Sequence, residues 1–182
     1  MPTSQWGRFP AQAHKVGINK LEFYNEKFGS DVVQTFVPRL QSAFAKAGIE
    51  GEYSLRGNVG PTVAAHRVAT YAGEKEGLEK QNAFMESMFK AYFIESATPC
   101  DPAVILNCAK EADLNLDACA EILAEDSTLY ATETERDMRT FGRGVNGVPH
   151  FIISNGDKSL SFGGAQPPES FIDAFETLGV QL

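Results

Sequence analysis

Over most of the chain, apolar residues recur every three or four positions, which is the spacing of helices that bury one face. Two helix starts carry additional signals: Asp101 followed by Pro102 is an N-cap with proline in the first turn, and Asn115 is a second capping residue. Pro38 lies inside another helical pattern, so we expect a kink there or two abutting helices. The predicted helices span about 21–28, 31–47, 61–73, 74–95, 101–113, 115–123 and 127–141.

Two short stretches between these helices carry weaker patterns. Residues 50–55 alternate polar and apolar side chains, which fits a strand or an extended connector equally well. Residues 57–61 combine glycine, asparagine and proline, and this composition predicts a turn.

The pattern changes near the C-terminus. Residues 148–154 form a run rich in β-branched and aromatic side chains, and residues 159–162 form a second one. Between them, either Asn155-Gly156 or Gly156-Asp157 predicts a hairpin turn. Pro167-Pro168 then opens a final amphipathic helix. The order is therefore a long helical middle followed by strand, hairpin, strand and helix.

Composition narrows the class of protein. With 182 residues, 43% hydrophobic and 22% charged, the chain suits one folded domain rather than a disordered segment. A net charge of −8 argues against a nucleic-acid backbone or an anionic membrane as the main partner. No apolar run approaches the roughly 20 residues that span a bilayer. We therefore expect neither nucleic acid nor membrane among its partners.

The cysteines indicate a reducing compartment. Cys100, Cys108 and Cys119 are odd in number and form no C-x-x-C spacing, so a disulfide framework is not expected. The N-terminus also lacks the features of a secretory signal, and we expect a cytoplasmic protein with reduced thiols. Cys100 stands at a helix N-terminus, where the helix dipole favours a thiolate, so it is a weak candidate for a reactive thiol. Cys108 and Cys119 lie on apolar helix faces, which is typical of core residues.

The histidines and one proline complete the candidate chemistry. His14, His66 and His150 show no metal-ligand spacing to one another or to the cysteines, so no metal site is expected. Pro149 stands at the start of a strand, and a bond before proline is trans by default but can be cis. A cis bond there would offer the amide and carbonyl of Val148 to an extended peptide or a glutathione-like ligand.

Several stretches resemble the DsbA-like thioredoxin-fold family, in particular its FrnE-type branch. The most specific are residues 144–153, which read GVNGVPHFII, and residues 162–171, which read FGGAQPPESF. Residues 20–29, 65–68 and 89–93 are also similar to that branch. The resemblance covers about residues 5–178.

The resemblance implies an α/β (α+β) fold, a single thioredoxin-like domain over residues 1–182. A large all-helical insertion would occupy about 30–143 and a C-terminal ββα unit about 147–180. It implies thiol–disulfide oxidoreduction on protein or peptide substrates, with Val148-Pro149 as the cis-proline loop that binds them. By the same resemblance, His66 on the helical cap and His150 after the proline are candidate substrate-binding residues.

The chain departs from the family at its N-terminal end. Members normally begin with a strand and a C-x-x-C motif at a helix N-terminus, and this βα unit is missing from the sequence. We therefore expect a chain that keeps the binding half without dithiol chemistry. The sheet would also lack the strand beside Val148, so another segment, or a second copy in a homodimer, would have to fill that place. The alternative function is a non-catalytic protein that binds peptide or glutathione through the Val148-Pro149 loop.

Overall fold

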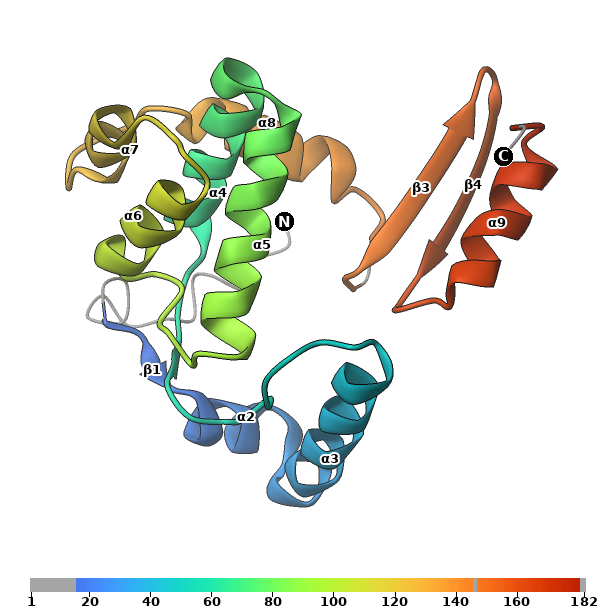
Figure 1. Cartoon of the computed structure of the whole chain (residues 1–182), viewed down its shortest axis with the longest axis horizontal. Helices are drawn as coiled ribbons and strands as arrows, with labels where there is room; N and C mark the ends of the chain where they lie inside the picture. The colour runs from blue at the N-terminus through green and yellow to red at the C-terminus, as the bar shows by residue number, and fades with distance from the viewer. Residues whose placement is uncertain (1–15, 146, 181–182) are drawn as a thin grey trace. The chain divides into compact units, whose positions relative to one another are not determined.

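The computed structural model describes residues 16–145 and 147–180. Its contacts divide the chain into two compact units, Met1–Glu135 and Arg136–Leu182. Helices dominate the first unit, whereas a strand hairpin and a helix make up most of the second (Figure 1). Among the described residues, no helix combines the length and the apolar character that crossing a membrane requires.

The first unit begins with a short ladder that the sequence pattern does not reveal. Strand β1 (Ile18–Asn19) pairs antiparallel with β2 (Asn58–Val59). The predicted turn over 57–61 is therefore wrong in its central part, because a strand of two residues is too short to show an alternating pattern. Residues 50–55 form a connector rather than a strand.

Two helices follow β1. Helix α2 (Lys20–Phe28) starts at Asn19, whose side chain accepts a hydrogen bond from the Glu22 amide. Helix α3 (Ser30–Lys46) continues through Pro38 as one helix, so the alternative of two abutting helices is wrong. Gly29 between them has a φ of 86°, which only glycine adopts without steric cost, and this allows the chain to turn from α2 into α3.

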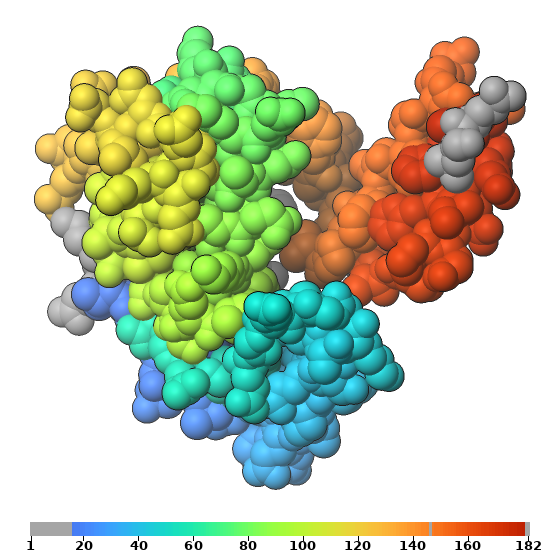
Figure 2. Space-filling model, viewed as in Figure 1, coloured from blue at the N-terminus to red at the C-terminus, as the bar shows by residue number. Residues whose placement is uncertain are grey.

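The core of the first unit lies among four helices. They are α4 (Val63–Tyr71), α5 (Leu78–Phe93), α6 (Pro102–Glu111) and α7 (Leu116–Leu123). Figure 2 shows α5, α6 and α7 as one closely packed surface. The fully buried side chains of this core include Val68, Phe84, Ile105, Cys108, Cys119 and Ile122. Cys108 and Cys119 are thus core residues, as their positions on apolar faces predicted.

Capping residues fix the starts of α6 and α7. The Asp101 carboxylate accepts from the Ala103 amide at 2.8 Å, and the Asn115 side chain accepts from the Ala118 amide at 3.0 Å. Both predicted caps are confirmed. The helix predicted from residue 74, by contrast, begins at Leu78, since Gly77 has a φ of 102° and separates α5 from a π-helical turn over Ala72–Glu76.

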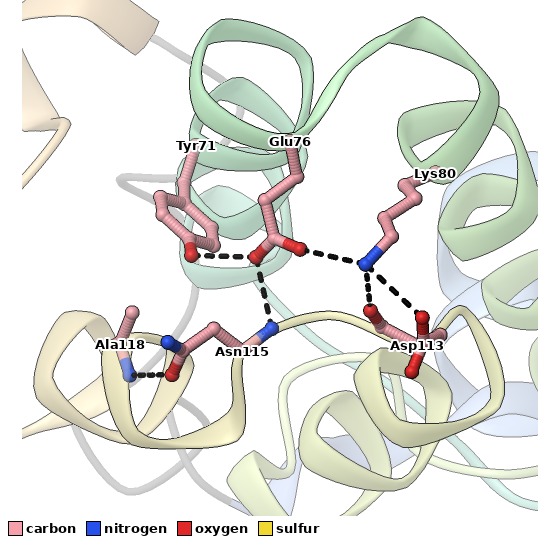
Figure 3. A network of polar contacts seen from close by, with 6 residues as sticks. All are labelled: Tyr71, Glu76, Lys80, Asp113, Asn115 and Ala118. Atoms are coloured by element: carbon pink, nitrogen blue, oxygen red, sulfur yellow. Dashed lines mark hydrogen bonds and ion pairs between the residues drawn. The ribbon is translucent and has the colours of Figure 1, made fainter.

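A half-buried carboxylate ties this π-helical turn to the segment between α6 and α7 (Figure 3). Glu76 accepts hydrogen bonds from the Tyr71 hydroxyl at 2.5 Å, the Asn115 amide at 2.8 Å and Lys80 Nζ at 3.0 Å. Lys80 also donates to the Asp113 carbonyl and pairs with its carboxylate at 3.2 Å. Burial alone would raise the pKa of Glu76, but the three hydrogen bonds outweigh it and the pKa is lowered.

The second unit is built on a hairpin. Strands β3 (His150–Asn155) and β4 (Lys158–Gly163) pair over six residues each, and the register leaves Gly156-Asp157 as the two-residue turn. Helix α9 (Pro168–Thr177) buries Ala174, with Leu178 just beyond its end. Helix α8 (Ala131–Phe141) precedes the hairpin, starts four residues later than predicted and contains the division between the units.

Three phenylalanines pack α9 on one face of the hairpin. Phe151 and Phe162 are opposite each other in the ladder, and both ring centroids lie about 5 Å from that of Phe171, at 4.9 and 5.1 Å. Both pairs meet edge to face, the arrangement that aromatic quadrupoles favour.

Replacing Glu76 by Gln should lower the free energy of unfolding at pH 7 by about 1–3 kcal/mol, because three donors lose a charged acceptor. The folded pKa lies below the ordinary value of 4.5, so this stabilisation is present above that pH and is lost as pH falls through the folded pKa. Denaturant unfolding of the wild type and of Glu76→Gln, measured between pH 7 and 3, should show that their difference in unfolding free energy becomes smaller as the pH falls. Exposed Glu79→Gln serves as the control, and a difference that stays constant with pH would contradict the assignment.

Candidate functional site

The predicted binding loop lies at the start of the hairpin. The Val148–Pro149 peptide bond is cis. The Pro149 carbonyl accepts from the Gly164 amide at 2.8 Å, which extends the pairing of the two strands by one position. Val148 stands just before this pairing, and the residue is 89% exposed.

The outer edge of β3 is open within the described chain. Because Pro149 and Gly164 are joined by a hydrogen bond, the residues of β3 at odd positions direct their backbone groups toward β4. Those at even positions direct N–H and C=O groups at the opposite edge, where the described sheet has no further strand. They are His150, Ile152 and Ser154. Ile152 is 55% exposed, on the face opposite the phenylalanine cluster.

His150 is the first residue of this edge. It is opposite Gly163 in the ladder, and a Cβ atom on Gly163 would lie 3.5 Å from His150 Nδ1. Since glycine has no side chain there, the imidazole has room beside the strand pair. The backbone of His150 points at the open edge while its ring stays half-buried.

His66 belongs to the other unit. It lies on α4, is exposed, and its Nδ1 is 2.7 Å from the Thr62 carbonyl. A carbonyl only accepts, so Nδ1 carries the proton and Nε2 is the ring nitrogen available to a ligand. His66 lines a cavity of about 810 Å³ within the first unit.

The three cysteines do not provide an activated thiol. Cys100 is 3% exposed, and burial raises its pKa, despite backbone hydrogen bonds that act in the opposite direction. Burial also raises the pKa of Cys108, and burial together with the Glu76 carboxylate raises that of Cys119 to about 11. The surroundings of Cys100 therefore give no support to the reactive thiol that its place at a helix start suggested.

The described residues contain no group of three or more His, Cys, Asp or Glu side chains arranged to hold a metal ion. His14 lies outside the described residues. The candidate functional features are therefore the open edge of β3, His66, His150 and the cavity in the first unit.

Comparison with known families identifies the fold. Residues 31–176, well over half of the chain, match the DSBA-like thioredoxin domain. The chain belongs to the DSBA-like thioredoxin family. No curated protein matches it. The helices and two small sheets of this DSBA-like chain agree with a thioredoxin-like fold that carries a helical insertion, so the predicted α/β (α+β) fold class is confirmed.

The sequence patterns of this DSBA-like chain predicted Val148, Pro149 and His150 as binding residues but did not point to Ile152, which lies on the same open strand edge. The alternation of a paired strand contained the signal, because Ile152 lies two positions after His150 on the same edge.

At pH 8 the three thiols should react with a disulfide reagent far more slowly in the native protein than after unfolding. For Cys119, raising the pKa from 9.0 to about 11 lowers the thiolate fraction about a hundredfold, and burial of all three slows access further. Absorbance of the released thiol, followed with and without denaturant, measures this. If one thiol per chain reacted in the native protein as fast as after unfolding, and Cys100→Ser abolished that reaction, Cys100 would be a reactive thiol after all.

Proposed function

We propose that this chain, from a family of thiol–disulfide oxidoreductase type, is a FrnE-branch member that binds extended peptides bearing thiols or disulfides without a dithiol of its own. The observation that carries the proposal is the open edge of β3, which continues from the exposed Val148. Backbone groups along such an edge bind an extended chain by adding it as a strand.

The thiols support the non-catalytic part of the proposal. Dithiol exchange needs an accessible thiolate with a second thiol close by. Here Cys100, Cys108 and Cys119 are all buried with raised pKa values, and the sequence has no C-x-x-C. Because the three cysteines are free thiols, they also fit a reducing compartment, and a cytoplasmic location is part of the proposal.

Glutathione is the small-molecule candidate for the same loop. It is itself an extended peptide with one thiol, so its backbone can pair with the amide and carbonyl of Val148. A second copy of the chain is the competing occupant, because β3 of one protomer can pair with β3 of another around a two-fold axis.

The protein should not accelerate the reduction of a disulfide-bonded substrate such as insulin by dithiothreitol, because it has no activated thiolate. Turbidity of the released chains measures the rate, with an intact dithiol member of the family as the positive control. Acceleration close to that of the control, whether or not Cys100→Ser removes it, would contradict the non-catalytic proposal.

An extended peptide of about ten residues with one cysteine should bind along β3. Ile152→Pro removes one outward N–H without touching a bond to β4, and should weaken binding about threefold to tenfold, as measured by fluorescence anisotropy. Ser161→Pro is the matched control, because Ser161 is opposite Ile152 and its N–H points to the other edge of the hairpin.

Light scattering and calorimetry separate the alternatives. If the wild-type protein has twice the mass of one chain and Ile152→Pro has the mass of one chain, the edge of β3 binds a second copy. Heat with glutathione that vanishes in the same variant would assign it to that ligand. No binding of peptide or glutathione, together with a monomer, would overturn the proposal.

A further inference from the structure

The cavity in the first unit is bounded by β2 and by helices α2, α4 and α5. Its volume of about 810 Å³ falls in the range typical of sites for small organic molecules. Most of its wall is apolar and adaptable, with methionines that fill irregular space and aromatic rings that add contact area. These side chains are Phe23, Met85, Met88, Phe89 and Phe93.

A buried cation lies against this wall. Lys20 is completely buried, and its Nζ lies 4.0 Å from the ring centroid of Tyr92, which lines the cavity. The one hydrogen bond described for Nζ goes to the Tyr92 carbonyl, at 3.3 Å. No carboxylate of the described chain pairs with it. A buried ammonium without an anion is costly, and burial accordingly lowers the pKa of Lys20.

The cavity wall itself provides one further positive group. Lys27 lines it, together with the carboxylate of Glu26. The hydroxyls of Tyr24 and Tyr92 hydrogen-bond to each other at the same wall, 3.1 Å apart. Around the cavity the ammonium groups of Lys20 and Lys27 thus outnumber the one lining carboxylate, in a chain whose net charge is −8. The charge of Lys20 lies in low-dielectric surroundings, so salt screens it little.

We propose that this cavity binds an amphiphilic anion, an apolar molecule with one carboxylate or similar acidic group. The apolar body contacts the methionine and phenylalanine side chains. The anionic group faces Lys27 and balances the buried charge of Lys20. The site lies in the first unit and needs no thiol, so it is independent of the function proposed for β3.

Decanoate and decanol test the proposal, because they share an apolar chain and differ in charge. Each is titrated against the neutral fluorophore N-phenyl-1-naphthylamine bound to the full chain, and the ratio of their apparent dissociation constants is the readout. The wild-type protein should prefer decanoate. Lys20→Met and Lys27→Met should each weaken decanoate binding about fivefold while leaving decanol unchanged.

Matched controls locate the site. Lys46→Met removes the same charge at an exposed position outside the cavity and should change neither constant. Phe89→Ala should weaken both ligands, whereas Leu78→Ala, exposed on the same helix, should weaken neither. Equal affinity for decanoate and decanol in the wild type would overturn the proposal. So would an effect of Lys46→Met as large as that of Lys27→Met, because net charge alone would then explain the preference.

Discussion

Packing of α4, α5, α6 and α7 around the fully buried Phe84, Ile105 and Ile122 is the interaction on which the first unit depends. Each such side chain contributes about 1.5–3 kcal/mol on burial, which is large against the stability of an ordinary domain. The same packing positions part of the cavity wall, since α4 carries His66 and α5 carries Phe89 and Tyr92. Glu76 reinforces it where the helical ladder departs from regular geometry, by pairing with donors from both sides of the π-helical turn.

In the second unit, unlike the first, an unpaired strand edge matters more than a buried core. A hairpin and one helix bury few side chains, chiefly Ala174 and Leu178 with the phenylalanine cluster, and β3 keeps one edge open in the described chain. Unpaired N–H and C=O groups along an edge favour an added strand, whether from a peptide or from another protomer. An interaction role for this unit therefore follows from hydrogen bonding more than from the identity of any side chain.

Two electrostatic effects act in opposite directions on the pKa of Cys100. A helix N-terminus stabilises a nearby anion by about 0.3–1 kcal/mol, whereas full burial moves a pKa by up to several units, each worth about 1.4 kcal/mol. At Cys100 burial is the larger effect, and the pKa rises. Lys20 obeys the same rule with the sign that applies to a base: burial lowers its pKa. The positive charge of Lys20 is energetically unfavourable in the protein without a ligand. An anion bound in the neighbouring cavity would offset that cost.

The sequence by itself determined the features whose causes are local. Helical spacing, the caps at Asp101 and Asn115, and the order of hairpin and final helix all depend on residues a few positions apart, and the structure has each of them. Only the tertiary structure decided what depends on distant neighbours. The β1–β2 ladder joins residues about forty positions apart, Lys20 is buried against Tyr92, and Cys100 is closed off from water. Burial and long-range pairing are properties of the packed chain, and no periodicity within one segment encodes them.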